Sequence, residues 1–220
     1  MSFEKPLAHR GLFSPQLPEN SLAAFQAAID EGYGIELDVM LTKDHQVIVF
    51  HDENLERLTG VNANVSDLTY DEIKALKLQS SDERIPSLIE VLELVAGSAY
   101  LMIEIKGKEG VIERKVYDII KNYVGDFSVC SFNSNILKWF RDNACDILRG
   151  QTSSGIFHLL FGCPKSRPHY ISYDIDRMPS KCLNRLIRLM DIPLIVWTVK
   201  NEKQLSFAKA YADNYIFEQY

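Results

Sequence analysis

The sequence predicts an α/β protein, and within that class a (β/α)8 barrel. Short apolar, β-branched runs alternate with segments of helical pattern along the chain. This alternation is typical of a parallel sheet whose strands are joined by helices. Runs such as Leu101–Ile105 and Ile192–Val196 are apolar at most positions, as expected of strands that are covered on both faces.

Nine strands are expected from these runs: Pro6–His9, Ile35–Leu41, Gln46–His51, Tyr100–Lys106, Phe127–Phe132, Ile147–Gln151, Tyr170–Tyr173, Leu194–Val199 and Tyr215–Phe217. Without Gln46–His51 eight remain, the number that closes this kind of barrel. An open, doubly wound sheet is the alternative. Its nucleotide-binding form needs a glycine-rich first turn, and the turn Arg10-Gly11-Leu12-Phe13 does not provide one.

The expected helices are Ser21–Glu31, Tyr70–Leu76, Ser87–Val95, Ile112–Asn122, Ser134–Asn143, Pro179–Met190 and Glu202–Tyr211. Asn20 or Ser21 and Ser134 are the residue types that cap helix N-termini. No final helix is expected, because the chain ends at Tyr220. Residues 53–85 are polar and too long for a strand–helix connection. We expect them to form a small insertion at the barrel mouth, after the second strand, within a single domain of residues 1–220.

Composition excludes several classes of protein. The net charge of −6 disfavours non-specific nucleic-acid binding. With 46% hydrophobic and 25% charged residues the chain has the composition of a globular protein, and no apolar run reaches membrane-spanning length, so stable membrane association is not expected. The N-terminus lacks a signal-peptide pattern, and the four cysteines are widely spaced. We therefore expect a cytoplasmic protein with reduced thiols.

Short polar clusters mark the ends of the expected strands. They read Ala8-His9-Arg10-Gly11, Pro18-Glu19-Asn20, Glu36-Leu37-Asp38, His51-Asp52 and, later, Glu104-Ile105-Lys106. Packing does not require an apolar strand to end in carboxylates or histidines. The clusters therefore predict a functional site where the carboxyl ends of the strands meet.

The carboxylates indicate a metal site. Glu36 and Asp38 are two residues apart on an expected strand, so their side chains point to the same side. Two buried carboxylates repel each other unless a cation or a shared proton lies between them. Glu104 has the corresponding place on the next main strand, and three carboxylates with waters suit Mg²⁺ or Ca²⁺. Solvated strand ends, or salt bridges to Arg10 and Lys106, are the simpler alternative.

His9 and His51 each end an apolar run, and histidine exchanges protons near neutral pH. A single histidine in this place is more often structural, but two of them beside three carboxylates favour an acid–base pair. Arg10 and Lys106 offer positive charge for an anionic, phosphate-like group. Supporting roles fall to three further residues: Asp52 orients His51 or Arg10, Glu19 complements a helix N-terminus, and Asn20 caps it.

The order His-Arg-Gly, Pro-Glu-Asn, Glu-x-Asp and His-Asp over residues 9–52 strongly resembles the glycerophosphodiester phosphodiesterase family. Glu104-Ile105-Lys106 and Trp197-Thr198-Val199 are similar to later motifs of that family, and 212–217 is similar to its closing motif. The likeness spans nearly the whole chain and is most specific in its first part.

The resemblance implies a TIM barrel with a small insertion after the second strand. The roles that it implies are a site for Ca²⁺ or Mg²⁺ (Glu36, Asp38, Glu104), an acid–base pair (His9, His51), phosphate contacts (Arg10, Lys106), a supporting residue (Glu19) and part of a glycerol pocket (Trp197). The implied reaction releases glycerol 3-phosphate and an alcohol.

These residues suit a two-step hydrolysis. His9 would remove the proton from the glycerol hydroxyl next to the ester, and the alkoxide would attack phosphorus to close a cyclic phosphate. His51 would protonate the departing alcohol, and water would then open the ring with the two roles reversed. The sequence leaves open which histidine acts first as the base.

Two other functions remain open. A related barrel acting as a lysophospholipase D or a phosphoinositide-type phospholipase C is disfavoured by the acidic chain. A non-catalytic phosphate-binding barrel is disfavoured because every proposed catalytic position is filled. The apolar segment Ile156–Gly162, in an expected strand–helix connection, would either receive a hydrophobic substrate group or pack as an ordinary amphipathic turn. The remaining histidines, His45, His158 and His169, are taken as structural.

Overall fold

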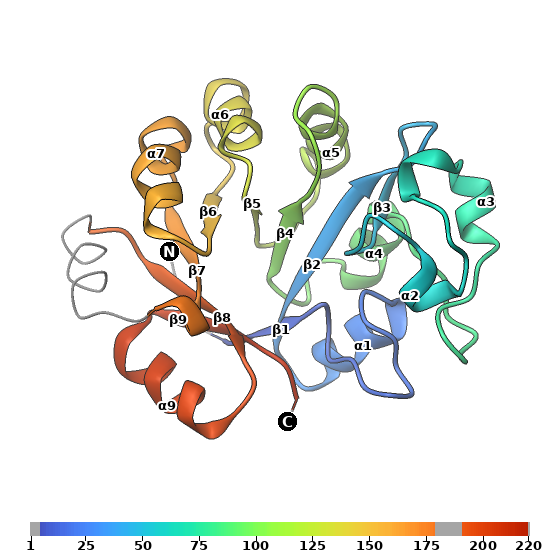
Figure 1. The fold of residues 1–220 in the computed structure, drawn as a ribbon, viewed down its shortest axis with the longest axis horizontal. Helices are drawn as coiled ribbons and strands as arrows, with labels where there is room; N and C mark the ends of the chain where they lie inside the picture. Colours follow the sequence, from blue (N-terminus) through green and yellow to red (C-terminus); the bar gives the residue numbers. More distant parts are fainter. Residues whose placement is uncertain (1–4, 179–190, 220) are drawn as a thin grey trace.

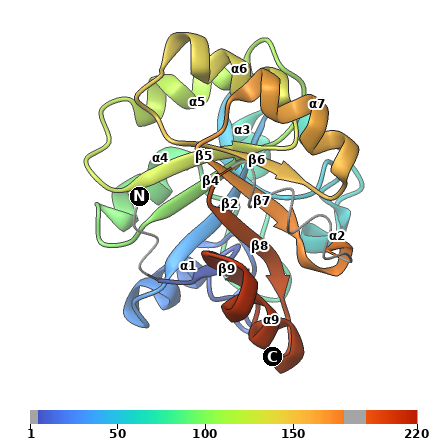
Figure 2. The same ribbon diagram turned by 90° about the vertical axis from the view of Figure 1, so that its left-hand side faces the viewer.

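Eight parallel strands close into a barrel. The computed structural model describes residues 5–178 and 191–219. Around the barrel the strands follow the order β1-β9-β8-β7-β6-β5-β4-β2, and β2 pairs with β1 to complete the circle. They are β1 (Leu7–His9), β2 (Gly34–Leu41), β4 (Leu101–Ile105), β5 (Phe127–Ser131), β6 (Arg149–Ser153), β7 (Tyr170–Asp174), β8 (Leu194–Val199) and β9 (Asn214–Phe217). The predicted barrel is confirmed (Figure 1, Figure 2).

One strand stands outside the barrel. β3 (Val47–Val49) runs antiparallel to the far end of β2, with Val39 opposite Val49 and Leu41 opposite Val47. The expected strand Gln46–His51 is therefore present, shorter than expected, and is correctly set apart from the eight barrel strands. Because β3 runs back along β2, the chain places His51 at the barrel mouth immediately after it.

Helices surround the barrel (Figure 1). They are α1 (Leu22–Asp30), α4 (Leu88–Val95), α5 (Ile112–Ile120), α6 (Ser134–Asn143), α7 (Ile156–Ser166) and α9 (Glu202–Tyr211), with a short 3-10 turn, η2 (Ile175–Arg177), after β7. Side chains cap several of them: Ser21 accepts from Ala24 at the start of α1, and Asn133, rather than the expected Ser134, caps α6. The helix expected at 179–190 lies outside the described residues.

Two elements near β6 differ from expectation. β6 lies two residues later than the predicted Ile147–Gln151. The segment placed in a connection forms α7, an eleven-residue helix that contains Pro164. Proline removes a backbone donor, which disfavours helix from sequence alone. Here Pro164 lies near the C-terminal end of the helix, between the buried residues Cys163 and Ser166.

Residues 53–85 form a compact layer beside β2 and β3. They contain α2 (Glu56–Thr59), the 3-10 turn η1 (Val65–Asp67) and α3 (Tyr70–Lys74), seen at one edge of the molecule in Figure 1. Leu58, Val65 and Ile73 pack with Ile48 of β3 and Phe50 in an apolar cluster separate from the barrel core. This cluster fixes the segment on the outer end of the barrel, next to the residues that follow β3.

Alternation along the strands separates core from site. On β2, Ile35, Leu37 and Val39 face the helices, and Glu36 and Asp38 face the barrel interior. The lower interior is apolar, filled by Leu7, Met102, Cys130, Tyr170, Ile195 and Ile216. Toward the carboxyl ends of β2 and β4 the inward positions instead carry Glu36, Asp38 and Glu104, which line a cavity.

Candidate active site

Three carboxylates converge at the barrel mouth. Glu36 and Asp38 project from β2, and Glu104 projects from β4, where it lies in register with Asp38. One oxygen from each residue lies within 4.8 Å of the others. Glu36 is 3% exposed and Asp38 is 2% exposed. The arrangement has the oxygen donors and the spacing that a hard divalent cation requires.

The electrostatics of this cluster favour a bound cation. Burial, together with the nearby charges of Asp38 and Glu104, raises the pKa of Glu36 well above its ordinary value. Burial also raises the pKa of Glu104, to about 6, although the neighbouring Lys106 lowers it. A divalent cation bound among the carboxylates would offset their mutual repulsion and favour their charged forms. The donor set therefore fits Mg²⁺ or Ca²⁺ on its own chemistry.

Two cations border the cluster. Lys106 Nζ lies 3.3 Å from both Asp38 Oδ1 and Glu104 Oε1. Arg10 Nε lies 3.4 Å from Asp38 Oδ2, and the Arg10 backbone N–H donates to Glu36 Oε2 at 3.1 Å. Burial raises the pKa of Asp38, but Lys106 and Arg10 more than offset this and lower it. Asp38 is thus ionised, and both cations face the place where an anion would bind.

His9 is held by a carboxylate from the far end of the chain. Its Nδ1 lies 2.8 Å from Glu218 Oε1, and its Nε2 lies 4.0 Å from Glu36 Oε2. Lys200 Nζ contacts the other oxygen of Glu218 at 3.1 Å. Burial raises the pKa of Glu218, but the contacts with His9 and Lys200 lower it to about 2. Glu218 is therefore a carboxylate, and it directs Nε2 of His9 toward the cluster.

His51 has an equivalent partner. Its Nδ1 lies 2.6 Å from Asp52 Oδ1, and Arg57 Nε donates to Asp52 Oδ2 at 2.5 Å. Burial raises the pKa of Asp52, but bonding to Arg57 and His51 lowers it to about 2. The pKa of His51 is lowered, by burial first and then by Lys106 and Arg10, against the opposing effect of Asp38. A neutral His51 has one ring nitrogen free to take a proton.

Asn20 does not cap α1, although the sequence suggested that it would. Ser21 is the cap of α1, and Asn20 instead donates from Nδ2 to Asp38 Oδ2 at 3.0 Å. Glu19 accepts from Arg10 Nη1 at 2.6 Å and from two nitrogens of Arg57. Both residues therefore bond groups of the site, and the expectation that Asn20 caps the helix was wrong.

A cavity of about 410 Å³ opens above the carboxylates. It is lined by the predicted site residues His9, Arg10, Glu36, Asp38, His51, Glu104, Lys106 and Trp197, and also by Phe132, Thr198, Lys200, Ile216 and Glu218. The indole Nε1 of Trp197 is buried and has no hydrogen-bond acceptor among the described residues. A ligand in the cavity can supply that acceptor.

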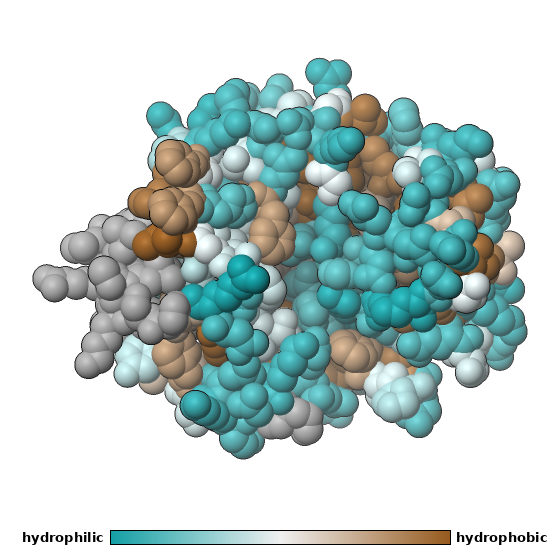
Figure 3. Space-filling view, viewed as in Figure 1, coloured by the Kyte–Doolittle hydropathy of each residue, from teal (hydrophilic) through white to brown (hydrophobic). Residues whose placement is uncertain are grey.

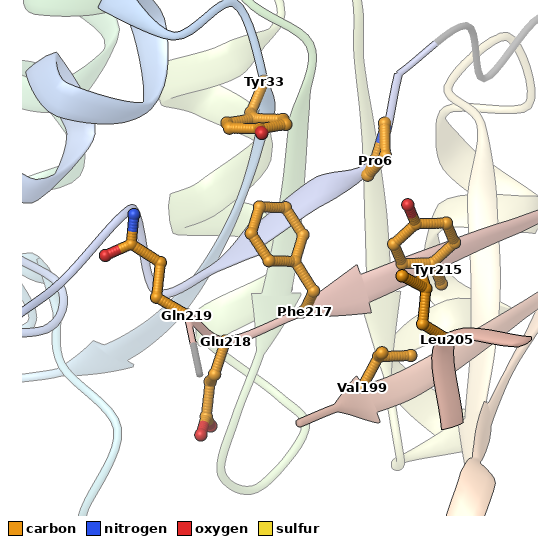
Figure 4. A pocket seen from close by; sticks show the side chains of 8 residues that line it. All are labelled: Pro6, Tyr33, Val199, Leu205, Tyr215, Phe217, Glu218 and Gln219. Carbon is orange, nitrogen blue, oxygen red and sulfur yellow. The ribbon is translucent and has the colours of Figure 1, made fainter. Parts of the chain in front are cut away.

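Glu218 also borders a second hollow, outside the barrel. This groove of about 560 Å³ is lined by Pro6, Tyr33, Val199, Leu205, Tyr215, Phe217, Glu218 and Gln219. In Figure 4 the Glu218 carboxylate turns away from the rings of Tyr33 and Phe217. The side chain thus separates the aromatic groove from the charged cavity.

The sequence did not predict four residues that border the site or bond its side chains: Arg57, Phe132, Lys200 and Glu218. Glu218 follows the closing motif directly, and Phe132 directly follows β5, so their positions after strands were a usable signal. Arg57 lies in the segment 53–85, and nothing in its local pattern relates it to Asp52 or Glu19.

Fold and site together define the class: a TIM barrel with an acidic, metal-type centre at the carboxyl ends of its strands. The family model described as the glycerophosphoryl diester phosphodiesterase family matches residues 9–216. The chain belongs to this family, as its motifs predict. A glycerophosphodiester phosphodiesterase from Caldanaerobacter subterraneus subsp. tengcongensis is 33% identical, and the match covers 96% of this chain and 92% of that protein.

Other relatives match to different extents. Human lysophospholipase D GDPD1 is 38% identical over 156 residues, which are 64% of this chain and 49% of the human protein. The match thus spans about half the length of that relative. A glycerophosphodiester phosphodiesterase structure from Thermotoga maritima has a TM-score of 0.82 at 29% identity, covering 99% of this chain and 96% of that one. An Oleispira antarctica phosphodiesterase has a TM-score of 0.89 at 23% identity, covering 98% and 93%, which shows the fold alone.

Within residues 5–178 and 191–219, no helix combines the length and the apolar character needed to cross a bilayer.

Proposed function

We propose that this protein hydrolyses glycerophosphodiesters to glycerol 3-phosphate and an alcohol, with a divalent cation. The observation that carries the proposal is the position of the three carboxylates, within one cavity, between two histidines that each have a carboxylate on Nδ1. The Caldanaerobacter relative is named for this activity, and the Oleispira phosphodiesterase was solved in complex with the product sn-glycerol-3-phosphate.

Glu36, Asp38 and Glu104 would hold Mg²⁺ or Ca²⁺. When bound, such an ion draws electron density from a phosphoryl oxygen and stabilises negative charge in the transition state. Arg10 and Lys106 would bind the phosphate oxygens, since both already border the cluster. Trp197 would place the glycerol group, with its buried N–H available to a hydroxyl oxygen.

The two histidines would move the protons. With Nδ1 bonded to Glu218, His9 presents Nε2 to the cavity and would take the proton of the glycerol hydroxyl. That oxygen attacks phosphorus, a cyclic phosphate forms, and the bond to the alcohol breaks. His51 would give a proton to the departing alcohol. Water then adds to phosphorus with the two roles exchanged, so that both histidines return to their first state.

Product analysis tests this proposal. Glycerophosphocholine incubated with the protein and Mg²⁺ or Ca²⁺ should release choline and glycerol 3-phosphate, measured by an enzyme-coupled assay. His9→Ala and His51→Ala should each lower kcat by roughly 10²–10⁴-fold, because each removes one proton-transfer group. His45→Ala, at an exposed turn, is the matched control and should keep wild-type activity. Full activity in His51→Ala would exclude the acid–base pair.

A lysophospholipid is a second candidate substrate. The human relative is named a lysophospholipase D, and the cavity is bordered by Phe132, which links it to exposed apolar side chains on α7. Such a substrate keeps the same phosphodiester and the same neighbouring hydroxyl, so the chemistry proposed for His9 and His51 is unchanged.

The organisation of the whole chain is also a proposal. We infer one domain over residues 1–220, with 53–85 as an insertion whose Arg57 reaches the site through Asp52 and Glu19. A cytoplasmic location is proposed on the composition and on the thiols of Cys130, Cys145 and Cys163, which are free among the described residues.

A further inference from the structure

Exposed apolar side chains gather on α7. Nine large apolar residues are exposed among the described residues, and four of them lie within the first six residues of α7: Ile156, Phe157, Leu160 and Phe161. Phe157 is 73% exposed and Phe161 is 77% exposed. Figure 3 shows hydrophobic side chains over α7, beside a hydrophilic centre. Single exposed apolar residues are ordinary, but a contiguous patch marks a binding surface.

The helix explains how the patch forms. Leu159 and Cys163 hold one face of α7 against the barrel. Phe157 and Phe161, four residues apart, lie side by side on the opposite face, and His158 lies on the flank next to Phe161. Because α7 follows β6 directly, its first turn lies at the level of the barrel mouth.

Aromatic rings connect this patch with the cavity. The ring of His158 stacks on Phe132, with 6.2 Å between the centroids. Phe132 in turn meets Trp197 edge-to-face at 5.8 Å, and both of these residues line the cavity. Ring contacts therefore lead from Trp197, at the place proposed for the glycerol group, through Phe132 to His158, which shares the first turns of α7 with Phe157 and Phe161.

We propose that this surface, the hydrophobic track, binds the acyl chain of a 1-acyl glycerophosphodiester whose phosphate lies in the cavity. The hydrophobic track comprises Phe132, Ile156, Phe157, His158, Leu160 and Phe161. The inference rests on the proposed function. An acyl chain is the part of such a substrate that leaves the glycerol pocket past Trp197. There it would meet the exposed apolar side chains of α7, where burying its methylene groups is favourable.

The chemistry stays balanced with this substrate. The free hydroxyl at glycerol C2 gives its proton to His9 and forms a bond to phosphorus, while the bond from phosphorus to the head-group alcohol breaks and His51 supplies that alcohol with a proton. Water then opens the cyclic phosphate and yields the acylglycerol phosphate. The acyl ester itself is not touched.

A chain-length series tests the hydrophobic track. Glycerophosphocholine is compared with its 1-hexanoyl, 1-octanoyl and 1-decanoyl derivatives, each kept monomeric, with Mg²⁺ or Ca²⁺ present. The value of kcat/KM should rise with chain length by up to about fourfold for each methylene that is buried. Hydrolysis of glycerophosphocholine with no gain from the chain would overturn the inference and leave the proposed function standing.

The double variant Phe157→Ser/Phe161→Ser locates the effect. Its kcat/KM on the octanoyl substrate should fall by at least about tenfold, which corresponds to the loss of roughly two buried methylenes. Its kcat/KM on glycerophosphocholine should stay at the wild-type value. Val124→Ser, which changes an 88% exposed side chain away from the cavity, is the matched control and should alter neither value. Equal losses on both substrates would contradict the hydrophobic track.

Binding without turnover separates the two proposals. If neither substrate is hydrolysed, the proposed function fails, and calorimetry with 1-octanoyl-glycerophosphocholine in EDTA decides the inference. Binding that exceeds that of glycerophosphocholine and is weakened in the double variant supports it, and equal binding overturns it. Two other results would overturn the inference if no chain-length effect is seen. Self-association that the double variant abolishes would assign the patch to a second copy of the protein, and sedimentation with phosphatidylcholine vesicles that the double variant abolishes would assign it to a membrane.

Discussion

Each proposed catalytic histidine has the same local arrangement, although the residues come from unrelated parts of the chain. Glu218 bonds His9 and is itself held by Lys200, while Asp52 bonds His51 and is held by Arg57. In both, a carboxylate fixes which ring nitrogen faces the cavity and stabilises the ring when it is charged. The two histidines proposed as proton carriers thus have matching surroundings, and both line the cavity that holds the three carboxylates.

Glu218→Gln should lower kcat on glycerophosphocholine by roughly 10–100-fold. The amide can still bond His9, but it no longer stabilises a charged imidazole ring, so KM should change little. Steady-state kinetics check the prediction, with Glu93→Gln on the exposed face of α4 as control. Recovery of part of the rate in Glu218→Asp would separate a positioning role from a merely structural one. An unchanged kcat in Glu218→Gln would refute it.

How much of the site the sequence predicts depends on where its residues lie. His9, Glu36, Asp38 and Glu104 lie within strands, so alternation and motif spacing place them together. The contact between His9 and Glu218 joins residues 209 positions apart, and only closure of the barrel creates it. Asn20 shows the opposite case, because its local pattern suggested a helix cap, whereas its side chain bonds Asp38.

At the scale of elements, the segment 53–85 is tied to the barrel helices through Glu90 of α4. Its Oε2 accepts from the Tyr70 hydroxyl at 2.7 Å and from the Ser87 backbone N–H at 2.8 Å, and its Oε1 accepts from Lys74 at 2.9 Å. One carboxylate therefore completes the capping box of α4 and also fastens α3. The periodic pattern predicted both helices, but not this connection, which depends on their tertiary placement.

Glu90→Gln should lower the free energy of unfolding by about 1 kcal/mol at pH 7. Burial raises the pKa of Glu90, but bonds from Lys74, Ser87 and Tyr70 lower it from 4.5 to about 2. The pKa of Glu90 is lower in the folded state than in the unfolded state. Its carboxylate therefore contributes fully to the free energy of unfolding above pH 4.5, and this contribution disappears as the pH falls toward 2.

Denaturant titrations of wild type and Glu90→Gln between pH 7 and pH 2 check this dependence. The difference between the two proteins should shrink on acidification, while Glu93→Gln, on the exposed side of the same helix, should match wild type throughout. A difference that grows with acid would have the wrong sign for a carboxylate with a lowered pKa.

At the scale of elements the least predictable piece was α7. Pro164 and two glycines, Gly155 and Gly162, surround or interrupt its apolar run, and local propensity therefore favours a connection. Packing overrides it: Gly162 lets the helix approach Gln151 of β6, where an added Cβ would lie only 3.0 Å from the Gln151 side-chain oxygen. The eight barrel strands were easier to predict, because continuous apolar runs signal them directly.

Across the whole molecule, the barrel brings together residues from β1, β2, β4, β8 and the end of β9 above an apolar interior. Strand ends that are remote in sequence become neighbours, and their charges are arranged around one position that suits a cation. The central claim is that Glu36, Asp38 and Glu104 hold a divalent cation on which hydrolysis depends.

The most direct test is a metal titration of hydrolysis. Protein stripped with EDTA is given increasing Mg²⁺ or Ca²⁺, and release of glycerol 3-phosphate from glycerophosphocholine is recorded for wild type, Glu104→Gln and the control Glu93→Gln. The stripped wild type should be inactive and regain activity along a saturable curve, and Glu104→Gln should need at least about tenfold more metal. Full activity of the stripped protein, or the same metal dependence in Glu104→Gln, would contradict this account.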